Sequence, residues 1–199
     1  MVNWLFIFCT MLCLSGFCVS AMAQEEKAEV CFDYSCAQKR MVTFSPAVME
    51  SVFLTMQLAR NAEEERMLLG ETIGLMYRVA GTQTPIFRDK GGNYDDDRLL
   101  PGAMDCIDHS TTANQFLILL EKRQLLRFHE VKPLVSRGAW LSIHWAAQIQ
   151  DKQTGEMFAV DRWFLDHGQP ALVMPINEWA QSRENQWLQK IGLLPSVKE

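Results

Sequence analysis

The sequence lacks an excess of basic residues. Its 19 Lys and Arg residues are outnumbered by 24 Asp and Glu residues, which gives a net charge of -5. A nucleic-acid-binding protein normally carries a basic patch or stripe, so nucleic acid is not an expected partner. Hydrophobic residues make up 48% of the chain and charged residues 22%. This balance excludes both a disordered chain and a polytopic membrane protein.

Charge is absent from the first residues, because Val2–Ala23 contains no charged side chain. The apolar segments Trp4–Phe8 and Met11–Val19 do not form the unbroken run of about 20 residues that a membrane span needs. Ser20–Ala23 offers the small-x-small pattern that signal peptidase cleaves. We therefore predict a signal peptide over 1–23 without stable membrane insertion after cleavage, and a periplasmic or secreted protein. An uncleaved anchor on a membrane-bound assembly factor is the alternative.

Cysteine is scarce beyond the leader, where only Cys31, Cys36 and Cys106 remain. Cys31 and Cys36 are close enough in sequence to form a disulfide in an oxidising compartment. A zinc site is not expected, because the spacing does not fit one and export favours the disulfide. That pairing leaves Cys106 as an odd thiol, which is either buried and inert or chemically reactive.

Internal repeats and low-complexity segments are also absent, so 24–199 is expected to form a single domain. Residues 24–30 are polar and expected to be loose. The helical part spans 45–81: Ser45 and Pro46 start one helix, and a second runs over about 62–79. Its acidic first turn, Glu63–Glu65, is expected to be solvated. The loop 82–104 is unusually long, which is typical of functional loops.

After this loop, the sequence pattern indicates one helix and then strands. Asp105 is expected to cap a buried helix that continues to about Lys122. Antiparallel strands follow, and a last helix is expected over 177–191, capped by Asn177. Helices followed by consecutive strands predict an α+β fold, with the cysteine-bearing helix packed on the sheet. The strands are expected at Leu126–Val131, Trp140–Gln150, Glu156–Phe164 and Ala171–Met174.

Cys106 is predicted at the first turn of its helix, where backbone N–H groups and the helix dipole stabilise a thiolate. Asp105 and Asp108 oppose this effect through their negative charge. A protonated His144 close to the thiol would again favour the thiolate. The helix-start N–H groups would line an oxyanion hole, with Asn93 as the side-chain candidate.

The hairpin register relates His144 to a carboxylate. A four-residue loop over Lys152–Gly155 places Asp161 opposite Ala146 and diagonal to His144, within reach of the imidazole. Asp161 would then accept the Nδ1–H of His144 and orient the ring. His109, one helical turn from Cys106, could reach the same cleft; His129 and His167 are weaker alternatives because no carboxylate is expected to orient them. The tryptophans form either the core or a substrate groove: Trp140, Trp145, Trp163, Trp179 and Trp187.

The run Asp105-Cys106-Ile107-Asp108 resembles the nucleophile motif of bacterial transglutaminase-like cysteine peptidases. Segments 143–146 and 159–164 match, in order and spacing, that family's His strand and Asp strand. The resemblance covers about 104–164. It implies a transglutaminase-like (papain-like) core over 105–176, with Cys106, His144 and Asp161 as the catalytic triad.

The resemblance implies an exported cysteine hydrolase, a peptidase or amidase, that forms a thioester with a protein or peptide substrate, such as one from the cell envelope. An inactive peptide-binding module and an amine-accepting transglutaminase are the alternatives. Calcium-dependent members carry an acid directly after the nucleophilic cysteine, where this chain has Ile107. No cofactor is therefore expected, although Asp105 and Asp95–Asp97 offer the oxygen ligands that calcium prefers.

Overall fold

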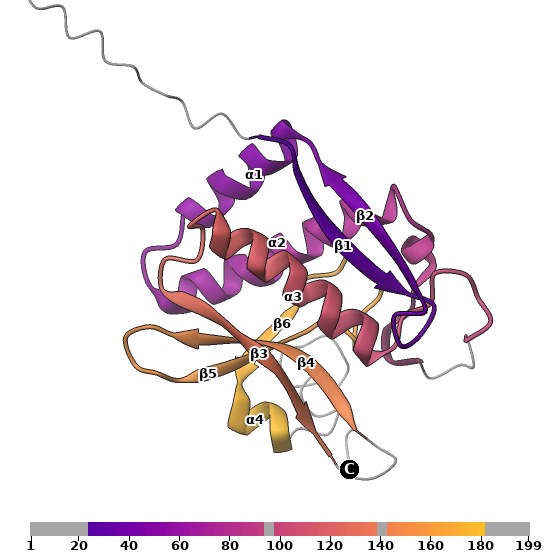
Figure 1. Cartoon of the computed structure of the whole chain (residues 1–199). Coiled ribbons are helices and arrows are strands. Elements are labelled where there is room, and N and C mark those ends of the chain that lie inside the picture. The colour runs from indigo at the N-terminus through magenta and orange to yellow at the C-terminus, as the bar shows by residue number, and fades with distance from the viewer. Residues whose placement is uncertain (1–23, 94–97, 139–142, 182–199) are drawn as a thin grey trace, which may run out of the picture.

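Residues predicted to be loose at the start of the domain form a β-hairpin instead. The computed structural model describes residues 24–93, 98–138 and 143–181 (Figure 1). Strand β1 (Glu26–Phe32) pairs antiparallel with β2 (Gln38–Phe44). Ala28 and Val30 are buried and alternate with the less buried Lys27 and Glu29, and Cys31 and Phe32 after them are both buried. This period of two was present in the sequence, and it favours a strand over a loose segment.

The predicted helical part is confirmed. Helix α1 spans Pro46–Gln57, and the Ser45 side chain accepts the N–H of Val48. Helix α2 spans Ala62–Gly81, longer by two residues than expected. The expectation of a solvated acidic first turn in α2 is wrong for Glu65, whose side chain is completely buried.

The region 82–104 contains two short 3-10 helices, Pro85–Arg88 and Gly91–Asn93, joined by irregular backbone. Helix α3 (Cys106–Lys122) follows with both bonds of a capping box. It contacts both β1 and the strands of a second sheet. Helix α3 therefore lies between the hairpin and that sheet (Figure 1).

The second sheet has four antiparallel strands in the order β3-β4-β5-β6. Expected and observed strand bounds differ by several residues. Helix α4 (Ile176–Gln181) begins just before the expected cap at Asn177, and the rest of that predicted helix lies outside the described residues. The strands are β3 (His129–Arg137), β4 (His144–Asp151), β5 (Met157–Asp161) and β6 (Leu172–Pro175).

Both faces of this sheet are covered. The main core joins the hairpin, α1, α2 and α3 to one face. A smaller cluster on the other face gathers Ala146, Ala159, Phe164, Met174 and Trp179. The predicted α+β class is confirmed, and α3 packs on an antiparallel sheet. Across 24–93, 98–138 and 143–181, no helix has both the length and the apolarity that crossing a membrane requires.

Candidate functional site

Cys106 is the first residue of α3, and its position is fixed by the capping box. Asp105 Oδ1 accepts the backbone N–H groups of Ile107 and Asp108, at 3.0 and 2.9 Å. In return, Asp108 Oδ2 accepts the N–H of Asp105 at 3.2 Å. Cys106 is partly exposed and is the only free thiol in the described part of the chain. Its Sγ lies 3.8 Å from the carbonyl oxygen of Ile143.

His144 and Asp161 meet at one end of the sheet. The β4–β5 register pairs Ala147 with Val160, so Asp161 comes opposite Ala146, as the loop length predicted. The imidazole Nε2 of His144 lies 2.6 Å from Asp161 Oδ2. The expectation that Nδ1 faces Asp161 is therefore wrong. Because Nε2 takes the carboxylate, Nδ1 is the ring nitrogen left for the thiol.

Asp161 is buried and held by two further donors. The indole Nε1–H of Trp179 donates to Oδ2 at 2.8 Å, and the backbone N–H of Trp163 donates to Oδ1 at 3.1 Å. Burial raises the pKa of Asp161, but the bonds from His144, Trp179 and Trp163 outweigh it, and the pKa is lowered overall. Asp161 is therefore ionised in the folded protein. The role of Trp179 was not predicted, because only the fold brings it to Asp161.

The pKa of His144 depends on both of the other candidate residues, Asp161 and Cys106. Burial lowers this pKa, but hydrogen bonds with Asp161 and Cys106 more than compensate and raise it from 6.5 to about 9. The imidazole therefore pairs with the carboxylate, and the Cys106 thiol also contributes to its raised pKa. Aromatic rings surround it, with ring centroids 4.9 Å (Trp163), 5.2 Å (Phe164) and 5.7 Å (Trp179) from its own. These rings keep water from most of the imidazole, whose side chain is 13% exposed.

Two competing histidines point elsewhere. His109 lies on a buried face of α3. Its Nε2 is 3.1 Å from Asp89 Oδ2, but the two groups are not aligned for a hydrogen bond. The expectation that His109 could reach the cleft of Cys106 is wrong, because that side of α3 faces the protein interior. Burial and the nearby Arg162 lower the pKa of half-buried His167 to about 4. His167 is therefore neutral at pH 7.

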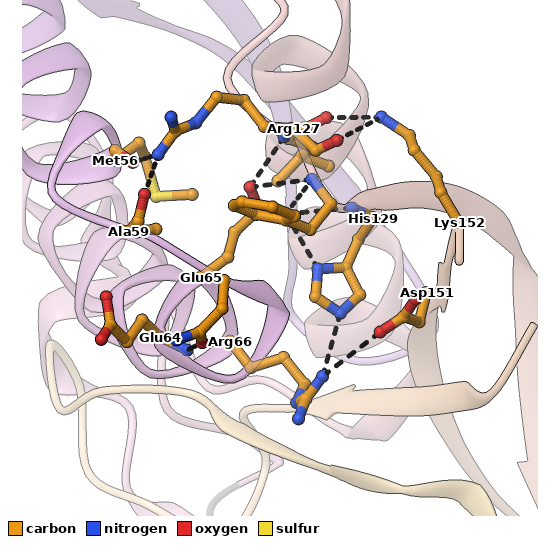
Figure 2. A network of polar contacts seen from close by, with 12 residues as sticks. Met56, Ala59, Glu64, Glu65, Arg66, Arg127, His129, Asp151 and Lys152 are labelled. Carbon is orange, nitrogen blue, oxygen red and sulfur yellow. Dashed lines mark hydrogen bonds and ion pairs between the residues drawn. The ribbon is translucent and has the colours of Figure 1, made fainter. Parts of the chain in front are cut away.

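His129 belongs to a buried network with Glu65, shown in Figure 2. Glu65 accepts the backbone N–H groups of Arg127, Phe128 and His129, and also the ring Nδ1–H of His129 at 2.8 Å. Arg66 Nη1 lies 3.3 Å from the other ring nitrogen. A guanidinium only donates, so this ring nitrogen of His129 is placed to accept from Arg66. The network fastens α2 to the start of β3.

The remaining predicted site residues have different outcomes. The Cys31–Cys36 disulfide is present, as predicted. The side chain of Asn93 and the run Asp95–Asp97 lie outside the described residues. In the described ranges, one trio has metal-ligand spacing, Cys31, Cys36 and Asp108, but the disulfide removes two of its thiolates. Both carboxylate oxygens of Asp105, the other acid considered for calcium, accept hydrogen bonds.

Comparisons of the whole chain with protein-family models, curated proteins and solved structures found no match. The resemblance to transglutaminase-like peptidases thus rests on the motifs around Cys106, His144 and Asp161.

Proposed function

We propose that the protein is an exported cysteine hydrolase, a peptidase or amidase with a transglutaminase-like core. One observation carries the proposal: His144 Nε2 lies 2.6 Å from the Asp161 carboxylate, and the Cys106 thiol lies 3.8 Å from the carbonyl oxygen of Ile143, the residue directly before His144. A thiol nucleophile needs a base, and the base needs an orienting acceptor. These three side chains supply each role once.

The proposed reaction proceeds through a thioester. His144 accepts the thiol proton, and Cys106 Sγ attacks the carbonyl carbon of an amide or ester. The backbone N–H of Cys106 stabilises the oxyanion, because the N–H groups of Ile107 and Asp108 already donate to Asp105. The imidazolium then protonates the leaving amine, and a water molecule activated by His144 hydrolyses the thioester. Asp161 remains ionised throughout and holds the ring in place, assisted by Trp179 and Trp163.

The first test is the iodoacetamide alkylation rate of Cys106 against pH, followed by peptide-resolved mass spectrometry. His144→Ala should slow the reaction at pH 7 by about a hundredfold or more, because the thiolate loses its ion-pair partner. His167→Ala is the matched control and should leave the rate unchanged. A Cys106 rate that is the same in the wild type and in His144→Ala would contradict the proposal.

The second test is acylation by p-nitrophenyl acetate, which releases one nitrophenolate for each thioester formed. We expect a burst in the wild type and none in Cys106→Ala, which should remain folded. A hydrolase passes the acetyl group to water even when a primary amine such as cadaverine is present. Transfer to the amine would favour the transglutaminase alternative, and the absence of acylation would favour a peptide-binding module.

A further inference from the structure

The Cys31–Cys36 disulfide closes a loop with unusual backbone geometry. Four consecutive residues that are not glycine, Asp33–Cys36, have positive φ angles of 64, 62, 55 and 55°. They form one left-handed turn, which is unfavourable for L-amino acids at each position. Such a turn persists only when its surroundings hold it. Here the disulfide joins Cys36, the last residue of the turn, to Cys31 in β1, and hydrogen bonds hold the residues between them.

The partner of this loop is the start of the cysteine-bearing helix. Ser35 donates its backbone N–H and its hydroxyl to Asp105 Oδ2, at 3.0 and 3.3 Å. The N–H of Cys36 donates to Asp108 Oδ1 at 2.7 Å. Asp33 adds a bond in each direction with the segment before α3: its N–H donates to Ala103, and its Oδ1 accepts from Gly102. The loop thus binds both carboxylates that flank Cys106.

These carboxylates are the groups that oppose a thiolate at position 106. Burial and the charge of Asp105 raise the pKa of Asp108 to about 6, so its carboxylate is ionised at pH 7. Donors from the left-handed turn offset both negative charges and hold the capping box in place. Without these donors, the two charges would disfavour the thiolate, and the first turn of α3 would lose its fixed position.

We infer that the Cys31–Cys36 loop is a positioning device for the Cys106 nucleophile, and that reduction of its disulfide turns the site off. The inference rests on the proposed function. A small dithiol is a sufficient reductant: one of its thiolates attacks a disulfide sulfur, and its second thiol resolves the mixed disulfide. Cys31 and Cys36 become thiols, and the dithiol becomes a cyclic disulfide. Cys36 is partly exposed, whereas Cys31 is 1% exposed, so attack occurs at Cys36.

The test compares Cys106 alkylation at pH 7 in oxidised protein, in protein reduced with dithiothreitol and desalted, and in Cys31→Ser/Cys36→Ser. Peptide-resolved mass spectrometry isolates Cys106, and near-ultraviolet circular dichroism confirms the fold. We expect the oxidised protein to react at least about tenfold faster than the other two. Glu29→Gln/Lys39→Ala breaks a surface ion pair in the same hairpin and is the matched control, with an unchanged rate.

A further variant covers the case in which the double serine variant fails to fold. Ser35→Pro keeps both cysteines, but it removes the N–H donor to Asp105 and cannot adopt a positive φ. In this variant, Cys106 should be alkylated as slowly as in the reduced protein. Equal rates in folded oxidised, reduced and variant proteins would overturn the inference. If His144→Ala still slows the alkylation of Cys106 in that case, the result supports the proposed function and contradicts only the role of the loop.

Discussion

At the residue scale, the site depends on the pairing of His144 with a buried carboxylate. Its pKa is raised from 6.5 to about 9 in the folded protein. A raised pKa means that the folded state binds the proton more tightly, so the pairing stabilises the fold fully below about pH 6.5. This stabilisation is lost as the pH rises through about 9.

Asp161→Asn tests whether this stabilisation is lost as the pH rises. The variant removes the charge that holds the proton on His144, so it should lower the free energy of unfolding more at pH 6 than at pH 10. Urea unfolding at both pH values measures the difference. Asp166→Asn is the control: that exposed carboxylate has a lowered pKa, so its contribution changes only in acid. An Asp161→Asn loss that is equal at pH 6 and pH 10 would contradict the pairing.

The same scale shows what residue patterns could predict. The loop Lys152–Gly155 fixed the register, and the register placed Asp161 beside His144. The ring nitrogen that faces Asp161 could not be predicted, because it depends on how the imidazole packs among Trp163, Phe164 and Trp179.

At the element scale, Glu65 connects α2 to the turn before β3. It is fully buried and accepts hydrogen bonds from three backbone N–H groups and from His129. Hydrogen bonds to a charged group contribute about 1.5–3 kcal/mol each, and an unpaired buried donor is costly.

Glu65→Gln should therefore lower the free energy of unfolding by about 3 kcal/mol, because one amide oxygen cannot replace two carboxylate oxygens and the amide N–H groups repel these donors. Glu64→Gln is the matched control in the same turn. Glu64 pairs with exposed Arg60, and surface pairs contribute little. Urea denaturation of both variants measures the contrast, and similar losses would show that Glu65 does not fasten the two elements.

At the scale of the whole molecule, α2 approaches the chain before β6 closely. The N–H of Ala171 donates to the carbonyl of Gly70 at 3.0 Å. A Cβ at Gly70 would lie 2.6 Å from the carbonyl oxygen of Ala171. This contact joins the helical layer to the four-stranded sheet.

Gly70→Ala sets two effects against each other. Alanine favours a helix by about 1 kcal/mol over glycine, whereas the overlap with backbone costs about 1–3 kcal/mol and forces the layers apart. We expect net destabilisation, visible as a lower melting temperature. Glu71→Ala, at the exposed neighbouring position, should change stability by less than about 0.5 kcal/mol. A stabilised Gly70→Ala protein would mean that the approach is not tight.

The sequence by itself determined the α+β class, the helix that begins at Cys106, the disulfide and the diagonal of His144 and Asp161. Each follows from local rules: capping, hydrophobic period, loop length and cysteine spacing. Only the tertiary structure decided which groups act on the candidate site from far along the chain. Trp179 reaches Asp161, the left-handed turn at Asp33–Cys36 reaches Asp105 and Asp108, and Glu65 is buried under the turn before β3. The physical reason is that a hydrogen bond depends on distance in space, and between distant segments that distance is set by the packing of the helices and sheets.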